Sequence, residues 1–256
     1  MLNLECVIVL PRIRCEMKTK LIIALTLFSV LSGCDLIDNF GDAKIESRRF
    51  NISSSIEHIK VYNTFDITLV QDNSSFAVIT CGEDIQSKVE IRVEDNVLIV
   101  DHNVNNRWLR GYEKIKIELH FPSVPVINVY KPCKIESLDT LKTDVFYLVD
   151  WGNFTDCRVC IDVDLFCIHS SGDSFGSYVI SGKALRSQIY CRGSANYTLN
   201  SFYMDSCFLS QESIMDIHLN VNNYLEVLIK STGNVYYTGE PTINLIRNGE
   251  GNLIRQ

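Results

Sequence analysis

The sequence contains little glycine or proline and no excess of positive charge. Its 256 residues include 13 Gly and 5 Pro, too few for a collagen-like or low-complexity chain. Lys and Arg number 24 against 31 Asp and Glu, which gives a formal charge of −7. Because such a chain offers no cationic field to a nucleic-acid backbone, we expect no nucleic-acid partner. The 46% apolar content still supports a sizeable core.

Motifs for cofactor and metal chemistry are also scarce. The chain has no Gly-x-x-x-x-Gly-Lys-Ser phosphate loop. Its five histidines are scattered, and no two of them have the spacing of metal ligands. We therefore expect no catalytic residue, no metal and no cofactor.

No apolar run in the sequence is long enough to cross a bilayer. The stretch Leu21–Leu31 has eleven residues and follows the basic segment Met17–Lys20. It ends at Leu31-Ser32-Gly33-Cys34, which resembles a bacterial lipobox. We interpret residues 1–33 as a signal peptide, with residues 1–16 as an over-extended start ahead of Met17.

The lipobox predicts the membrane as a partner. The thiol of Cys34 would carry the lipid, and each buried methylene of an acyl chain contributes about 0.8 kcal/mol to membrane binding. Residues 34–44 would form a lipid-anchored tether, and the expected location is the cell envelope, at the outer membrane. The alternative interpretation is a buried core helix that ends in cysteine.

Seven of the ten cysteines remain for the folded part once those of the leader and the lipobox are set aside. Because seven is odd, at least one must stay free. Core packing is the favoured role, while a disulfide among the seven or a metal site at Cys157-Arg158-Val159-Cys160 are alternatives. The seven are Cys81, Cys133, Cys157, Cys160, Cys167, Cys191 and Cys207.

Alternation of apolar and polar residues predicts short β-strands over residues 45–128. Asp95-Asn96 is expected to form a hairpin turn between two of them. The expected strands are residues 59–62, 65–70, 76–80, 89–93, 97–100 and 115–121.

Turn-forming residues recur at a nearly constant interval over residues 129–256. Their centres at 132, 152, 172, 193, 212, 233 and 250 are separated by 20, 20, 21, 19, 21 and 17 residues. Such a period is typical of a solenoid, in which one coil cannot bury its own apolar face. We predict an all-β fold, a right-handed parallel β-helix of about 20-residue coils preceded by the short-stranded β region. An antiparallel sandwich with evenly spaced hairpins is the alternative.

Glycine is expected at the corners of these coils because the backbone there would turn through positive φ. Two corners, Lys131-Pro132 and Gln211-Glu212-Ser213, lack glycine and are expected to be distorted. The predicted coil-turn residues are Gly152, Gly172, Gly193, Gly233, Gly249 and Gly251.

Several of these segments resemble the autotransporter adhesin head GIN domain family, which has recurrent Gly-Ser-Gly-Asp-Val turns and a terminal Tyr-x-Gly-x-Pro. The resemblance covers about residues 45–256 and implies a β-helical envelope domain, common in lipoproteins of Bacteroidetes-type bacteria. The similar segments are the turns Ser171-Gly172-Asp173, Ser231–Pro241 and Asn248–Ile254, and the preceding strands Phe65–Gln71 and Ile115–Pro122.

Recognition through a surface is the function that these observations favour. We predict a non-enzymatic, lipid-anchored module of the adhesion or binding type, with a glycan or a protein as its ligand. Aromatic residues at turns, such as Tyr130, Trp151, Phe154 and Phe175, are candidates for a strip that contacts it. The favoured contact loop is polar, and its candidate residues are Arg107, Trp108, Arg110 and Tyr112.

Two other functions stay open at this point. A carbohydrate-active β-helix enzyme, a lyase or hydrolase, would need clustered carboxylates, and Asp162 and Asp164 lie on one face of an expected strand. A structural envelope module that binds further copies of itself is the third possibility.

Overall fold

The structure is a computed structural model that describes residues 44–52, 55–104 and 114–256. The described part is nearly all β, with 69% of its residues in strands. A single short helix among the described residues, α3 (Glu83–Gln86), follows β4. The strands are β1 (Ile45–Asn51), β2 (His58–Val61), β3 (Asp66–Gln71), β4 (Phe76–Gly82), β5 (Val89–Glu94), β6 (Val97–His102), β7 (Lys116–Phe121), β8 (Val126–Val129), β9 (Lys134–Asp150), β10 (Asp156–Ser170), β11 (Ser177–Gly193), β12 (Asn196–Ser213), β13 (Ile217–Ile229), β14 (Val235–Thr238), β15 (Thr242–Arg247) and β16 (Leu253–Arg255).

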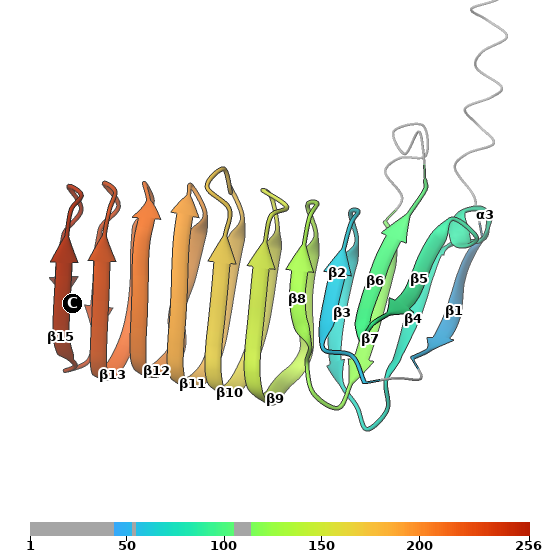
Figure 1. Cartoon of the computed structure of the whole chain (residues 1–256), viewed down its shortest axis with the longest axis horizontal. Helices are drawn as coiled ribbons and strands as arrows, with labels where there is room; N and C mark the ends of the chain where they lie inside the picture. The colour runs from blue at the N-terminus through green and yellow to red at the C-terminus, as the bar shows by residue number, and fades with distance from the viewer. Residues whose placement is uncertain (1–43, 53–54, 105–113) are drawn as a thin grey trace, which may run out of the picture. The chain divides into compact units, whose positions relative to one another are not determined.

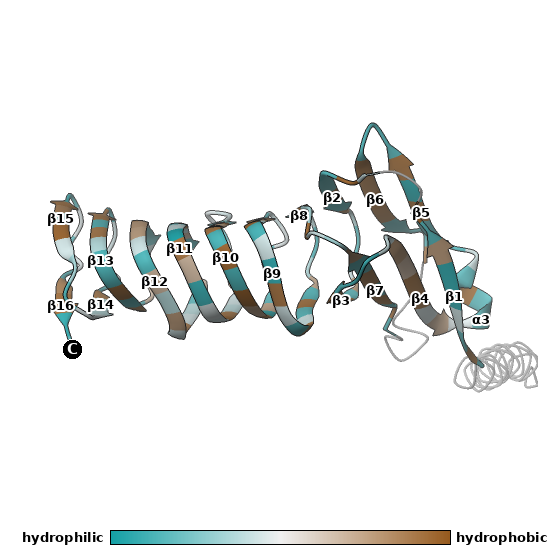
Figure 2. Ribbon diagram, turned by 90° about the horizontal axis from the view of Figure 1, so that it is seen from below, coloured by the Kyte–Doolittle hydropathy of each residue, from teal (hydrophilic) through white to brown (hydrophobic). Residues whose placement is uncertain are grey.

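The strands from β8 onward wind into a parallel β-solenoid of about 6 turns, with coils about 20 residues apart (Figure 1). The winding is right-handed (Figures 1 and 2). Each coil has two faces. Face A contains β2, β8, the second halves of β9 to β13, and β15. Face B contains β3, the first halves of β9 to β13, β14 and β16. The predicted parallel β-helix is therefore confirmed.

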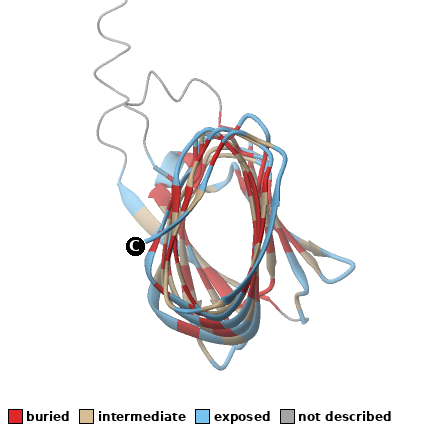
Figure 3. Cartoon of the chain, turned by 90° about the vertical axis from the view of Figure 1, so that its left-hand side faces the viewer, coloured by how far each residue is buried: buried red, intermediate tan, exposed pale blue. Residues whose placement is uncertain are grey.

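Regular stacking places equivalent residues of successive coils side by side. Strand β10 pairs in parallel with β11 from Asp156↔Ser177 to His169↔Tyr190. Because side chains alternate between inside and outside, the inner positions form the core. Apolar and polar bands alternate along the strands in Figure 2, and the coils superimpose when they are seen end-on in Figure 3. Within the core, the ring centroids of Phe146 and Phe166 lie 6.2 Å apart.

The N-terminal β region contributes the first coils of the stack. Strands β2 and β3 pair in parallel with β6 and β7 on one side and with β8 and β9 on the other. Beyond them, β5 pairs antiparallel with β6, β4 with β7 and β1 with β4. These antiparallel strands occupy the hydrogen-bonding edge at this end of the stack. Asp95 and Asn96 have positive φ between β5 and β6, so the expected hairpin turn is present.

Strands β2 to β7 start and end within about two residues of the predicted ones, whereas β1 was not predicted. Later strands differ more, because they continue around the second corner of each coil and reach 13 to 18 residues. Strand β12 runs on through the glycine-free corner to Ser213, and the turn forms after it. The corner at Lys131-Pro132 keeps register with the coil of β2 and β3, but the corner of the following coil is one residue longer.

Positive φ does not explain most of the coil-turn glycines. Of the six predicted, only Gly193 has a positive φ, +69°. Close approach of the neighbouring coil is the more general reason: a Cβ at Gly152 would lie 2.5 Å from the carbonyl oxygen of Lys131. The same holds at Gly233, Gly249 and Gly251, whose added Cβ would also meet backbone oxygen, whereas Gly172 has nothing within 4 Å.

The opposite corner of the coils holds two glycines that the period did not identify. Gly182 and Gly239 have φ of +100° and +101°. A Cβ on Gly182 would overlap the carbonyl oxygen of Ile161 in the preceding coil. Both the dihedral angle and the contact therefore require glycine at this position.

Replacing Gly182 by alanine tests this requirement. We expect Gly182→Ala to lower the free energy of unfolding by about 2 kcal/mol or more, because strain at positive φ adds to a backbone overlap. Gly172→Ala is the matched control and should change it by less than about 0.5 kcal/mol. Urea unfolding followed by circular dichroism measures both. Equal stability of the two variants would contradict the requirement for glycine at position 182.

Candidate functional site

Several of the predicted site residues lie outside the described residues. These are the lipidation residue Cys34 and the four residues of the contact loop, Arg107, Trp108, Arg110 and Tyr112. In the described part of the chain, no helix is long and apolar enough to cross a membrane.

No disulfide joins any two of the seven cysteines of the folded part. Six are buried, which agrees with the core-packing interpretation, and Cys160 is half-buried. Burial raises the pKa of the Cys133, Cys191 and Cys207 thiols to about 12, so these groups stay protonated and unreactive at neutral pH. Across residues 44–52, 55–104 and 114–256, no group of three or more His, Cys, Asp or Glu side chains could hold a metal ion.

A serine in the motif Gly172-Asp173-Ser174-Phe175-Gly176 has the spacing of a nucleophile elbow. Ser174 is fully buried, and its hydroxyl accepts the backbone N–H of Gly176 at 3.1 Å. Its oxygen also lies 3.4 Å from the Tyr178 hydroxyl. No histidine among the described residues hydrogen-bonds to it, so Ser174 shapes a turn here.

The carboxylates considered for catalysis lie together on the outside of β10. Asp162 and Asp164 line a cavity of about 340 Å³ with Lys183 and Tyr203. The Lys183 ammonium lies 3.4 Å from an Asp162 oxygen and neutralises part of the charge. This cavity lies at the corner that contains Gly182.

Exposed aromatic side chains gather at the other corner, where the chain passes from face A to face B. Tyr62, Tyr130 and Trp151 occupy equivalent positions in three successive coils, because Val61 pairs with Val129 and Val129 with Asp150. Phe154 lies in the same turn as Trp151, and Phe175 lies in the next turn. We call these five residues (Tyr62, Tyr130, Trp151, Phe154 and Phe175) the aromatic edge.

The rings of the aromatic edge stack along the solenoid axis. The centroids of Tyr62 and Tyr130 lie 4.9 Å apart at an interplanar angle of 8°. Those of Phe154 and Phe175 lie 5.5 Å apart at 14°. Trp151, Phe154 and Phe175 remain 51%, 62% and 59% exposed. The solenoid therefore presents ring faces and edges to solvent in adjacent coils.

A buried carboxylate shapes the turn that carries two of these rings. Asp150 is fully buried, and its Oδ1 accepts hydrogen bonds from the backbone N–H of Gly152 at 2.6 Å and from the Thr155 hydroxyl at 2.9 Å. Its Oδ2 accepts a hydrogen bond from the Tyr178 hydroxyl. Burial raises the pKa of Tyr178, so this hydroxyl remains a donor. The turn holds Trp151 and Phe154 in place because its backbone is tied to the core.

Polar groups lie among the rings. The Asn153 amide donates to Asp173 Oδ2 at 2.9 Å, and the Ser171 hydroxyl lies 2.9 Å from Asp173 Oδ1. The hydrogen bond from Ser171 lowers the pKa of Asp173, so its carboxylate is charged at neutral pH. Asn153 takes positive φ, +67°, a conformation that asparagine tolerates better than most residues.

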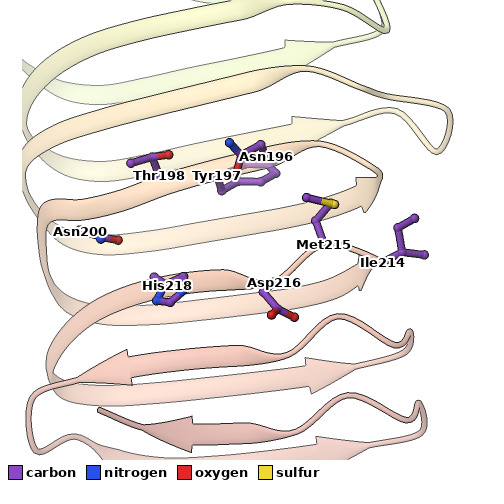
Figure 4. Close-up of a pocket in the computed structure, with 8 residues that line it drawn as sticks. All are labelled: Asn196, Tyr197, Thr198, Asn200, Ile214, Met215, Asp216 and His218. Atoms are coloured by element: carbon purple, nitrogen blue, oxygen red, sulfur yellow. The ribbon is translucent and has the colours of Figure 1, made fainter.

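A pocket of about 440 Å³ lies further along the same corner, on the outside of β12 and β13 (Figure 4). The pairing of these strands is irregular here: Thr198 pairs with His218, but Tyr203 pairs with Asn220, so five residues of β12 face two of β13. The turn after Ser213 brings up two apolar side chains, Ile214 and Met215. The pocket is lined by Asn196, Tyr197, Thr198, Asn200, Ile214, Met215, Asp216 and His218.

Sequence analysis found part of this corner and missed part of it. Trp151, Phe154 and Phe175 are exposed there as proposed, whereas Tyr197 and Tyr237, also considered, are buried. Tyr62 was missed because it lies in the region assigned to short strands. The pocket was missed because the turn spacings around it, 19 and 21 residues, stay close to the period and do not indicate an irregular coil.

Comparison with known proteins gives a family and a fold. A family model described as "Putative auto-transporter adhesin, head GIN domain" matches residues 56–241. No curated protein matches the sequence.

Solved structures from Bacteroides and Parabacteroides species share the fold. A "putative adhesin" from Bacteroides fragilis has 17% identity and a TM-score of 0.74. A "putative adhesin" from Parabacteroides distasonis has 17% identity and 0.64. A "putative lipid binding protein" from Parabacteroides distasonis has 15% identity and 0.60. Each comparison covers 84% of this chain and 98% of the other. At these identities, the likeness shows the fold alone.

The hydrogen bond from Tyr178 to Asp150 provides a test of how this corner is held. We expect Tyr178→Phe to lower the free energy of unfolding by about 1 to 3 kcal/mol, because one oxygen of a buried carboxylate loses its donor. Tyr236→Phe is the control: its half-buried ring stacks on His218, and phenylalanine keeps that contact. Urea unfolding compares the two. A loss no larger for Tyr178→Phe than for the control would show that the bond is unimportant.

Proposed function

This chain belongs to the auto-transporter adhesin head GIN domain family, and from that premise we propose that it is a non-enzymatic binding module of the cell envelope that contacts a glycan through its aromatic edge. The observation that carries the proposal is the group of exposed rings at Trp151, Phe154 and Phe175, with polar groups between them.

Exposure of these rings has a free-energy cost in the absence of a ligand. Elsewhere the solenoid buries large aromatic side chains such as Phe146, Phe166 and Phe202 completely, although Tyr203 and Tyr224 are exposed. Apolar side chains that gather on a surface mark interaction sites, whereas single ones do not. Neighbouring coils hold these rings at a fixed spacing, so little ordering entropy is lost on binding.

The chemistry of the edge favours a sugar. The apolar C–H faces of a pyranose pack on aromatic rings, while its hydroxyls need polar partners. Asn153, Ser171 and Asp173 supply an amide, a hydroxyl and a carboxylate beside the rings. A purely apolar ligand would remove water from these groups without replacing the hydrogen bonds of that water, which would weaken its binding.

The two alternatives have weaker support. For an enzyme, Asp162 and Asp164 share a cavity, but the Lys183 ammonium already pairs with Asp162. For a self-associating module, the exposed rings would also serve between copies of the chain. Neither alternative uses the polar groups at Asn153 and Asp173.

The proposal includes a lipid anchor at Cys34, which supports a location at the outer membrane. The lipobox residues Leu31–Cys34 follow a basic segment and an apolar stretch, as in bacterial lipoproteins. More than one acyl chain is needed for stable anchoring, and a lipoprotein cysteine carries more than one.

A glycan array probed with the full chain tests the binding proposal. We expect binding to a restricted set of glycans and its loss in the triple variant Trp151→Ala/Phe154→Ala/Phe175→Ala, by about tenfold or more in affinity, because the ring contacts are removed. The control triple variant Leu138→Ala/Leu185→Ala/Tyr203→Ala removes equally exposed side chains from the opposite corner and should bind like the wild type. No bound glycan, or equal loss in both variants, would refute the proposal.

The anchor is tested separately in cells grown with radiolabelled palmitate. The wild-type chain should incorporate label, and the Cys34→Ala variant should not. The control is Cys160→Ala, which changes the half-buried cysteine of the folded part and should still incorporate label. Label that survives in Cys34→Ala would show that the anchor is elsewhere or absent.

A further inference from the structure

At the corner where the chain passes from face A to face B, the exposed apolar side chains form one row along the solenoid. Trp151 and Phe154 lie in the turn between β9 and β10, Phe175 in the next, and Ile214 and Met215 two turns later. Ile214 and Met215 are 61% and 41% exposed. The row therefore continues from the aromatic edge to the pocket on β12 and β13.

Backbone hydrogen bonds connect these turns coil by coil. The Phe175 N–H donates to the Asn153 carbonyl at 2.6 Å, and the Ile214 N–H donates to the Gly193 carbonyl at 3.2 Å. Between them, Ser177 pairs with Asn196. Four consecutive turns are thus spaced by the strand separation, and the row spans roughly 14 Å along the axis.

The turn in the middle of the row has small side chains. It contains Gly193 and Ser194, and Gly193 cannot be enlarged because an added Cβ would lie 2.7 Å from the Ser174 carbonyl oxygen at a positive φ. Because these side chains are small, the surface of this turn is lower than the Phe175 ring and the Ile214 side chain on either side of it. A ligand that lies along the row can pass over it.

The pocket beyond this turn offers polar groups that the fold does not use. The side chains of Asn196, Thr198 and Asn200 are exposed on β12 and make no hydrogen bond to another described residue. Figure 4 shows them on one coil, with Asp216 and His218 on the next. Amides and a hydroxyl in an open pocket with an apolar wall can pair with sugar hydroxyls.

The charges along the row disfavour an acidic ligand. Two cations near the pocket end of the row, Arg192 and Lys230, both pair with Glu212, at 3.2 and 2.8 Å. Asp173 and Asp216 accept hydrogen bonds from neutral groups only, among them the Asn234 backbone N–H on Asp216. Carboxylates without a cation repel a uronic-acid chain, so the favoured ligand is a neutral glycan.

From this geometry we infer that the ligand is a linear neutral glycan that lies along the solenoid axis, with one part on the aromatic edge, a middle part over Gly193 and Ser194, and its end in the pocket at Asn196 and Met215. This inference rests on the proposed function and adds the length, direction and charge of the ligand. Its specific consequence is that long chains bind better than short ones.

The experiment measures affinity against chain length by isothermal titration calorimetry of the full chain in detergent. The probes are cello-oligosaccharides and chito-oligosaccharides of two to six sugars, with oligogalacturonates as the acidic comparison. In at least one neutral series, we expect the affinity to rise by about tenfold or more from the disaccharide to the tetrasaccharide or longer. Oligogalacturonates should bind more weakly at every length.

Two variants test whether the pocket causes the gain in affinity with saccharide length. Asn196→Ala/Thr198→Ala should reduce hexasaccharide affinity to the disaccharide level and leave the disaccharide unchanged, whereas Trp151→Ala/Phe154→Ala should weaken every length. Both pocket positions are exposed, so the fold should tolerate the change.

The outcomes separate this inference from the proposed function. Neutral saccharides that bind with the same affinity at all lengths, or a pocket variant that behaves like the wild type, would overturn the inference and leave the binding function standing. Tighter binding of oligogalacturonates would overturn the neutral ligand. If no saccharide binds to the wild type, both the inference and the glycan-binding function fail.

Discussion

Backbone hydrogen bonding between coils is the constraint on which the rest of this protein depends. No coil can pair its own N–H and C=O groups, so each must lie at the strand spacing from its neighbours and in register with them. The pairing of β10 with β11 continues without a break around most of the coil. This constraint places every side chain in a column that runs along the axis, and the column decides which side chains meet.

Columns explain both the core and the surface. Inner columns bring Phe146 next to Phe166, while outer columns bring Phe154 next to Phe175. An exposed ring therefore stacks on its counterpart in the next coil even where no core requires it. A row of similar groups at a regular spacing is the natural surface of such a fold, and it suits a ligand that is itself a repeating chain.

The period of the turns was sufficient to predict the parallel solenoid, because one spacing reports the length of every coil. The reason for its glycines was harder to predict. At Gly152, the requirement comes from the Lys131 carbonyl of another coil, and no local pattern contains that contact. Gly182 was missed for a related reason: it lies at the second corner, where β11 continues through Ser181-Gly182-Lys183 as one strand.

The same limit applies to the candidate site. Exposed aromatic residues next to glycine were recognisable at Trp151 and Phe154. Tyr62 was not, because it stacks on Tyr130 only through the pairing of β2 with β8, which are far apart in the sequence. The pocket arises where β12 has more residues than β13 between two paired positions. Side chains alternate between the inside and the outside of the solenoid, so the outer positions do not take part in the core. Substitutions at this corner can therefore occur while the hydrogen-bonded frame stays the same. A family that keeps this frame at low sequence identity is therefore expected to differ in ligand, and the side chains of this corner are where the difference should lie.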